Sequence, residues 1–179
     1  AERGMGPFHT PAVFPAAVKL DLGNQYKIDT LVINGAECEP YVTADDRMMR
    51  EHADEVIDGA RIMARVLNAA RVVVGIEDNK PEAIRAMQKA AEGFAEASVA
   101  TVPARYPMGY AHELILAITG HETPAGKRTA EVGAVAYNVN TARAVHQAVR
   151  LGRPLISRVV TASGGALRHP ANLSAPIGA

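Results

Sequence analysis

Four short runs of apolar and mostly β-branched residues recur along the chain, and each gives way to a polar loop. The runs cover residues 30–34, 71–76, 98–102 and 132–137. Continuous apolar runs of this length are typical of parallel strands that are buried on both faces. Helical patterns separate the runs, so the sequence predicts an α/β fold: a Rossmann-like layered arrangement around a mostly parallel sheet.

The segments between these runs carry the spacing of amphipathic helices. Apolar residues repeat at helical spacing over residues 45–67, which predicts one helix there. Pro81 suits the first turn of a second helix, which we expect to reach about Gly93. Two more helices are predicted over residues 111–119 and 141–150, and residues 121–129 are expected to form an exposed connection.

Proline and glycine mark the segments outside this pattern. The first 17 residues hold three prolines and two glycines, and we expect them to form a loop. After Pro154 the helical spacing stops, and residues 158–161 followed by Gly164-Gly165 predict the start of a β-hairpin. We therefore expect an α/β domain over residues 1–156 and the start of another domain over residues 157–179.

Charge and cysteine content exclude several classes of protein. The chain has 179 residues, with 19 Lys and Arg against 19 Asp and Glu, and this balance argues against a nucleic-acid binder. No apolar run approaches the roughly 20 residues that span a bilayer. Cys38 is the only cysteine, so the chain forms no internal disulfide and cannot hold an iron–sulfur cluster, which takes about four ligands. We expect a reducing, cytoplasmic compartment.

Common catalytic motifs are missing. The six histidines show no metal-binding spacing, and no serine stands in a G-x-S-x-G motif. Gly126-Lys127 shares only two residues with a phosphate-binding loop. The residue pattern alone therefore predicts an α/β domain whose ligand crevice lies at the carboxyl ends of the strands. The loops at those ends are expected over residues 34–46, 77–80, 106–110 and 137–141.

Four blocks of the sequence resemble a known family. They are VINGAECEPYVTADDR (32–47), GIEDNKP (75–81), YPMG (106–109) and YNVNTA (137–142). In this order they closely resemble the RnfC family, which is part of the Rnf ion-translocating electron-transport complexes. A looser likeness is to the FMN- and NADH-binding subunit of respiratory complex I.

The resemblance implies an NADH-linked oxidoreductase subunit. FMN accepts a hydride from NADH, and electrons leave through 4Fe-4S clusters whose cysteines follow in the family but are absent from this sequence. The tail from residue 157 is similar to the beginning of a β-grasp-like domain of the SLBB type, here truncated. The resemblance further implies that the partners are other subunits of a membrane-bound Rnf-type complex. The protein is then peripheral on the cytoplasmic face of the inner membrane, without a membrane span of its own.

The resemblance also assigns site residues, none of them catalytic or metal-binding. Residues matching those near FMN are Lys19, Asn34, Glu37, Cys38, Tyr106, Gly109, Asn138 and Thr141. Residues matching those near NADH are Phe14 and Glu39. A lysine offsets a phosphate or an anionic ring, and a helix start offers backbone N–H groups to an anion. Plainer roles remain open: a solvated lysine, a turn asparagine, an acidic turn, a helix cap or core packing.

One stretch departs from the family pattern. Family members carry a glycine-rich loop directly before the Phe14-Pro15 pair, whereas residues 8–13 here carry side chains and Pro11. A proline removes a backbone donor, and side chains crowd a phosphate. Two alternatives therefore stay open beside the flavoprotein: a flavin-free scaffold that docks partner subunits, and the equivalent domain of a cobalamin reductase.

Overall fold

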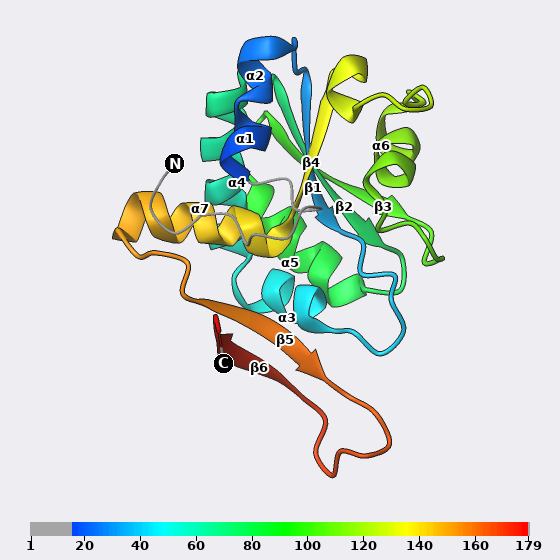
Figure 1. Ribbon diagram of the computed structural model, residues 1–179, viewed down its shortest axis with the longest axis vertical. Helices are drawn as coiled ribbons and strands as arrows, with labels where there is room; N and C mark the ends of the chain where they lie inside the picture. The colour runs from blue at the N-terminus through cyan, green and yellow to red at the C-terminus, as the bar shows by residue number, and fades with distance from the viewer. Residues whose placement is uncertain (1–15, 179) are drawn as a thin grey trace.

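The computed structural model describes residues 16–178, and its elements alternate between helix and strand (Figure 1). In chain order they are α1 Ala16–Leu20, α2 Leu22–Gln25, β1 Thr30–Gly35, α3 Ala44–Glu51, α4 Ala53–Leu67, β2 Arg71–Glu77, α5 Pro81–Ala91, β3 Ala97–Val102, α6 Ala111–Thr119, the 3₁₀ turn η1 Thr129–Val132, β4 Ala134–Asn138, α7 Val139–Leu151, β5 Ser157–Ala162 and β6 Ala171–Pro176.

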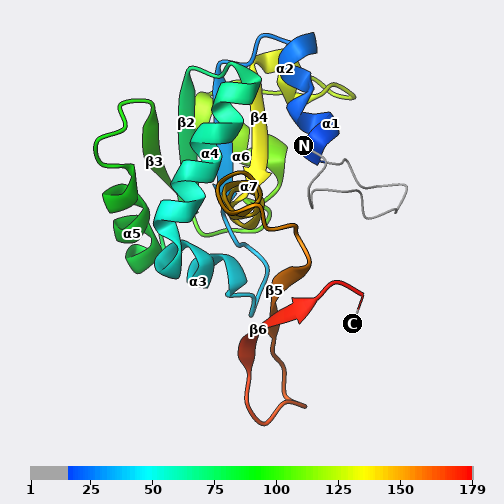
Figure 2. The same ribbon diagram turned by 90° about the vertical axis from the view of Figure 1, so that its left-hand side faces the viewer.

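A four-stranded sheet of order β3-β2-β1-β4 forms the centre, and all its neighbouring strands are parallel. Helices α4, α5 and α7 cover one face, while α6 covers the other (Figures 1 and 2). The predicted α/β fold with a mostly parallel sheet is therefore confirmed. The chain returns after β3 to place β4 on the far side of β1. In open α/β sheets, ligands bind outside the carboxyl ends of the strands at such a reversal.

The central strand β1 is buried on both faces. Leu31 and Ile33 belong to the cluster that includes Met63 of α4. Val32, between them, packs in the cluster with Leu114 of α6. Fully burying an apolar side chain of this size contributes roughly 1.5–3 kcal/mol, so the strand is held firmly between two helical layers. The loops that follow its carboxyl end start from a rigid edge.

Four predicted boundaries were wrong. The helix expected over residues 45–67 is two helices, because the chain bends at His52 (φ −135°, ψ 32°), which closes α3 and opens α4. The fourth strand starts at Ala134, since residues 129–132 form a 3₁₀ turn that ends at Gly133 with φ 77°. Helix α7 begins at Val139, two residues early, because Asn138 is its N-cap. Helix α1 includes Ala16 and Ala17, which were expected in a loop.

The last two strands form a separate antiparallel sheet. Ser157 of β5 lies opposite Pro176 of β6, which confirms the predicted start of a hairpin. The hairpin lies beside α3 and the loop that precedes it (Figure 1). That residues 157–179 open a β-grasp-like domain stays a prediction. Within residues 16–178, no helix has the length and apolar character needed to cross a membrane.

Candidate functional site

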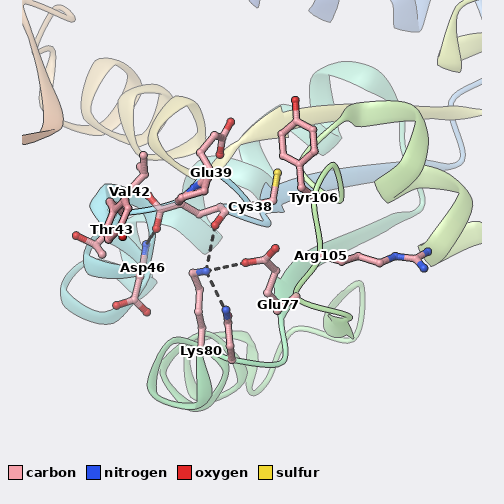
Figure 3. A pocket seen from close by; sticks show the side chains of 14 residues that line it. Cys38, Glu39, Val42, Thr43, Asp46, Glu77, Lys80, Arg105 and Tyr106 are labelled. Carbon is pink, nitrogen blue, oxygen red and sulfur yellow. Dashed lines mark hydrogen bonds and ion pairs between the residues drawn. The ribbon is translucent and has the colours of Figure 1, made fainter. Parts of the chain in front are cut away.

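A cleft of about 420 Å³ opens at the carboxyl ends of β1, β2 and β3 (Figure 3). The loops after these three strands supply its walls. Four predicted site residues line it: Glu37, Cys38, Glu39 and Tyr106. Glu39 and Tyr106 are exposed at this opening, Tyr106 by 74% of its surface. Both are available to a ligand that enters from solvent.

A buried ion pair forms one wall of the cleft. Glu77, at the end of β2, is almost fully buried, and its carboxylate lies 2.7 Å from the ammonium of Lys80. The ammonium also donates to the backbone carbonyl of Glu37 and to the side-chain oxygen of Asn79, both at 3.3 Å (Figure 3). Lys80 thus ties the loop after β1 to the loop after β2. The sequence predicted that this loop borders the ligand crevice, but it did not single out Glu77 and Lys80. Their signal in the sequence is that they are charged residues at the end of a buried strand.

Glu37 is turned toward helix α3. Its carboxylate accepts the backbone N–H groups of Asp45 at 2.8 Å and Asp46 at 3.2 Å, and so caps the helix. Burial raises the pKa of the Glu37 carboxyl, and the two N–H groups oppose that rise. Glu37 borders the cleft, but its carboxylate oxygens are occupied by the protein.

Asn34, Cys38 and Gly109 come together and satisfy one another. The Asn34 amide donates to the Gly109 carbonyl at 2.8 Å and accepts from the Ala36 N–H at 3.0 Å. The Gly109 N–H donates to the Cys38 sulfur at 3.3 Å. A side chain at Gly109 has no room, because its Cβ would stand 2.6 Å from the Ala36 carbonyl oxygen. These three residues join the loop after β1 to the loop after β3.

The end of β4 carries a second polar group of residues. Asn138 lies beside Asn34 in the register of the sheet and accepts the N–H of Asn140 at 2.8 Å as N-cap of α7. Asp45, from the first turn of α3, accepts the side-chain amides of Asn138 and Asn140, each at 2.5 Å. Burial raises the pKa of Asp45, and the two amides oppose the rise. Sequence reasoning missed this role of Asp45, because its partners lie more than 90 residues away.

Lys19 reaches the same strand from α1. Its ammonium donates to the carbonyl of Ala136 and stands 4.7 Å from the ring centroid of Tyr137. Burial lowers the pKa of Lys19. Within residues 16–178 no carboxylate pairs with it. Its burial and its bond to a backbone carbonyl argue against the alternative of a solvated lysine. A half-buried cation without a counter-ion suits an anionic ligand.

The structure says little about two of the predicted site residues. Thr141 lies half-buried in the first turn of α7, close along the helix to its N-cap Asn138. Phe14 lies outside the described residues. The predicted residues thus form two groups: one around the cleft, and one at the end of β4 with Lys19, Asn138 and Thr141. Asn34 links the groups, since it is bonded to the cleft loops and is the register partner of Asn138.

Residues 4–147 match the family described as Nuo51 FMN-binding domains. Among curated proteins, the chain is 54% identical over 169 residues to the C subunit of the ion-translocating oxidoreductase complex of Rhodobacter capsulatus, a match over 93% of this chain and 32% of the relative. It is 49% identical over 167 residues to the C subunit of the proton-translocating ferredoxin:NAD(+) oxidoreductase complex of Clostridium ljungdahlii, over 93% of this chain and 36% of the relative. The chain spans about a third of these relatives, and the resemblance to the RnfC family is confirmed.

A solved structure shares the fold. The air-oxidized NAD+-reducing [NiFe]-hydrogenase contains a chain that superposes with a TM-score of 0.76 at 20% sequence identity. The match covers 99% of this chain and 35% of the hydrogenase chain. At that identity the likeness shows the fold alone.

Proposed function

Because this chain belongs to the family of Nuo51 FMN-binding domains, we propose that it holds FMN at the end of β4 and accepts a hydride there from NADH. In the longer protein, electrons then pass to 4Fe-4S clusters that follow this segment. That protein is a subunit of a membrane-bound Rnf-type complex and is peripheral on the cytoplasmic face of the inner membrane. The role is that of an NADH-linked oxidoreductase subunit.

The observation that carries this proposal is the half-buried ammonium of Lys19. It is bonded to Ala136, two residues before the N-cap Asn138, and lacks a counter-ion within residues 16–178. Burying an uncompensated charge is unfavourable, and a phosphate or an anionic flavin ring offsets that cost. The donor set therefore fits FMN.

The N-terminus of α7 adds backbone N–H donors at the end of the same strand. Its 13 residues begin directly after β4, where Asn138 caps the Asn140 N–H, and a helix N-terminus is a favourable position for an anion. Asp45 fixes the Asn138 side chain through its amide. Bound FMN supplies an acceptor that takes two electrons as a hydride and releases them singly.

The cleft is the proposed entry for NADH. Glu39 is exposed there, and a carboxylate accepts hydrogen bonds from ribose hydroxyls. Tyr106 supplies an exposed ring on the opposite loop, against which a flat group can pack. Asn34 joins this cleft to the end of β4, so a nucleotide in the cleft lies next to the proposed flavin.

An absorbance spectrum tests the proposal. The purified chain, with FMN added, is expected to retain a yellow chromophore after gel filtration, and NADH added without oxygen should bleach it. A chain that stays colourless under excess FMN contradicts FMN binding. A chain that is yellow but is not bleached by NADH contradicts the proposal that NADH is the electron donor.

One observation favours the scaffold alternative. Asn34, Cys38 and Gly109 satisfy one another, so these three groups need no ligand to complete their hydrogen bonds. A flavin-free domain that docks partner subunits is the function that a colourless result would support. The same spectrum therefore decides between the two candidates.

A further inference from the structure

The outer wall of the cleft is a loop that has few contacts of its own. We name residues 39–43 the outer loop; all five are exposed, and they include Glu39. Within the loop, the Val42 N–H meets the Glu39 carbonyl at a long 3.4 Å. Tyr41 has φ 67°, a left-handed conformation that is unfavourable for a bulky residue and persists only where the surroundings hold it. The loop therefore depends on its two ends.

The near end is attached to the α/β domain. Lys80 binds the carbonyl of Glu37, and the Gly109 N–H binds the sulfur of Cys38. These contacts stop one residue before the outer loop. Its far end, Thr43, is held by other partners.

The far end starts helix α3, since the Thr43 carbonyl accepts the Arg47 N–H at 3.1 Å. It is also bound by the hairpin, through a set of residues that we name the clamp: Thr43, Thr161 and Asn172. Thr161 of β5 and Asn172 of β6 are register partners, and the Thr161 hydroxyl donates to the Asn172 side-chain oxygen at 2.7 Å. The Asn172 amide donates to the carbonyl and the hydroxyl of Thr43, at 3.2 and 3.0 Å. The Thr43 N–H donates to the Thr161 hydroxyl at 3.1 Å. The clamp thus closes a ring of hydrogen bonds between segments about 120 residues apart.

Asn172 is the central member of the clamp. Its side-chain amide donates to Thr43 and accepts from Thr161 at the same time. Ser174, two residues along β6, is exposed and makes no such contact. Strand β6 therefore offers a matched control position.

We propose that Asn172 is a positioning residue for the nucleotide side of the cleft, which it serves by fixing the outer loop at Thr43. The proposal rests on the proposed function, in which Glu39 of that loop contacts the nicotinamide nucleotide. The hairpin then acts on NADH binding and not on FMN binding, because Lys19 and Asn138 lie outside the clamp.

Hydrogen exchange tests the clamp without any ligand. In Asn172→Ala, the amides of residues 41–43 are expected to exchange about tenfold faster, as loss of roughly one net hydrogen bond predicts. Asn172→Asp keeps the size and the acceptor but cannot donate to the Thr43 carbonyl, which would then face a carboxylate, and should show the same change. Ser174→Ala should leave exchange as in the unmodified chain. Unchanged exchange in both Asn172 variants overturns the proposal.

Anaerobic titration tests the functional part. With FMN bound, Asn172→Ala should raise the dissociation constant for NADH about fivefold to tenfold, while the FMN dissociation constant and the limiting rate of bleaching stay unchanged. Faster exchange with unchanged NADH affinity overturns the positioning role. An equal rise in both dissociation constants also overturns it, since the hairpin would then stabilise the whole domain. If the unmodified chain binds no FMN, the proposed function fails, and the exchange experiment still decides whether the clamp exists.

Discussion

Lys19 carries a charge in a half-buried position, and within residues 16–178 the ammonium contacts a backbone carbonyl and the face of an aromatic ring but no carboxylate. Such a group weakens the ligand-free protein and strengthens the complex with an anion. The same side chain therefore has opposite effects on stability and on binding.

Lys19→Met should separate these effects. We expect FMN binding to weaken about tenfold or more, because a charge-assisted hydrogen bond contributes about 1.5–3 kcal/mol. The free energy of unfolding of the ligand-free chain should not fall, since an uncompensated charge is removed. Quenching of flavin fluorescence measures the affinity, and urea unfolding measures stability. Lys27→Met, at an exposed position, is the control; equal FMN affinity in both variants would refute the role of Lys19.

Gly109→Ala tests the close contact between the loops after β1 and β3. The added methyl would stand 2.6 Å from the Ala36 carbonyl oxygen, so the loops must separate. We expect a loss of about 1–3 kcal/mol in urea unfolding. Gly165→Ala, where nothing lies within 4 Å of the new methyl, should change stability by less than about 0.5 kcal/mol. Equal stability of the two variants would show that the loops tolerate separation.

The sequence predicted which residue types gather at the site, but not their partners. Lys19 and Asn138 were assigned from the resemblance to the family, yet the bond from Lys19 to Ala136 joins positions 117 residues apart. Cys38 was expected beside the flavin, and its observed partner is the Gly109 backbone. Local spacing carries no information about such contacts, because they depend on how the strands are ordered in the sheet.

At the scale of elements, α4 and α7 approach each other closely at a glycine. A Cβ at Gly59 would stand 1.8 Å from the Ala142 carbonyl oxygen of α7. Gly59→Ala should push the helices apart and cost about 3 kcal/mol, near the upper end for overpacking. Val66→Ala on the exposed side of α4 is the matched control, with an expected loss below about 0.5 kcal/mol. Chemical unfolding measures both; a small effect of Gly59→Ala would contradict this packing.

A carboxylate of α4 links the two helices electrostatically. The Arg150 side chain donates to Asp58, as does the ring of His146 when protonated at Nδ1, and these bonds lower the Asp58 pKa to about 2. A folded-state pKa below the ordinary 3.8 means that the stabilisation is present above pH 4 and is lost as the pH falls toward 2. Solvent screening limits it to about 1 kcal/mol.

Asp58→Asn should therefore lower the melting temperature at pH 7 and leave it nearly equal to that of the unmodified chain near pH 2. Calorimetry or circular dichroism across this range gives the measurement. Asp54→Asn, at an exposed first-turn position of the same helix, controls for the loss of a surface charge. A difference that is constant between pH 7 and pH 2 would exclude the Asp58 carboxylate as the cause.

The elements themselves were largely predictable. Apolar runs located every strand of the main sheet within about two residues, because burial on both faces leaves few alternatives. The break at His52 gave no signal, since neither proline nor glycine stands there and the apolar spacing continues into α4. Val132 was counted as strand because it is β-branched, but the positive φ of Gly133 separates it from β4.

At the scale of the whole molecule, the hairpin meets the rest of the chain at α3, at the outer loop and beside α7. A chain that ends at Ile156 should keep cooperative unfolding, because the four parallel strands and their helices precede that residue. We expect its free energy of unfolding to fall by about 1–2 kcal/mol, since Val159 packs against the core. Thermal melting by circular dichroism tests this; loss of a cooperative transition would contradict the predicted boundary at residue 156.

The order of the strands in the sheet could not be predicted from local sequence patterns. Alternating strands and helices are compatible with several orders, and the return of the chain past β1 to place β4 is decided by long-range packing. This return puts Asn34 and Asn138 side by side, so the candidate site exists only in the assembled sheet.

Strand β4 is an outer strand of the sheet, and such strands tend to recruit a strand from another molecule. Ala134, Val135, Ala136 and Tyr137 of β4 are nevertheless buried, so packing against the rest of the molecule covers this outer strand. Lys19 is part of that cover, because its ammonium donates to the Ala136 carbonyl. A strand from another molecule would have to displace these contacts before it could pair with β4.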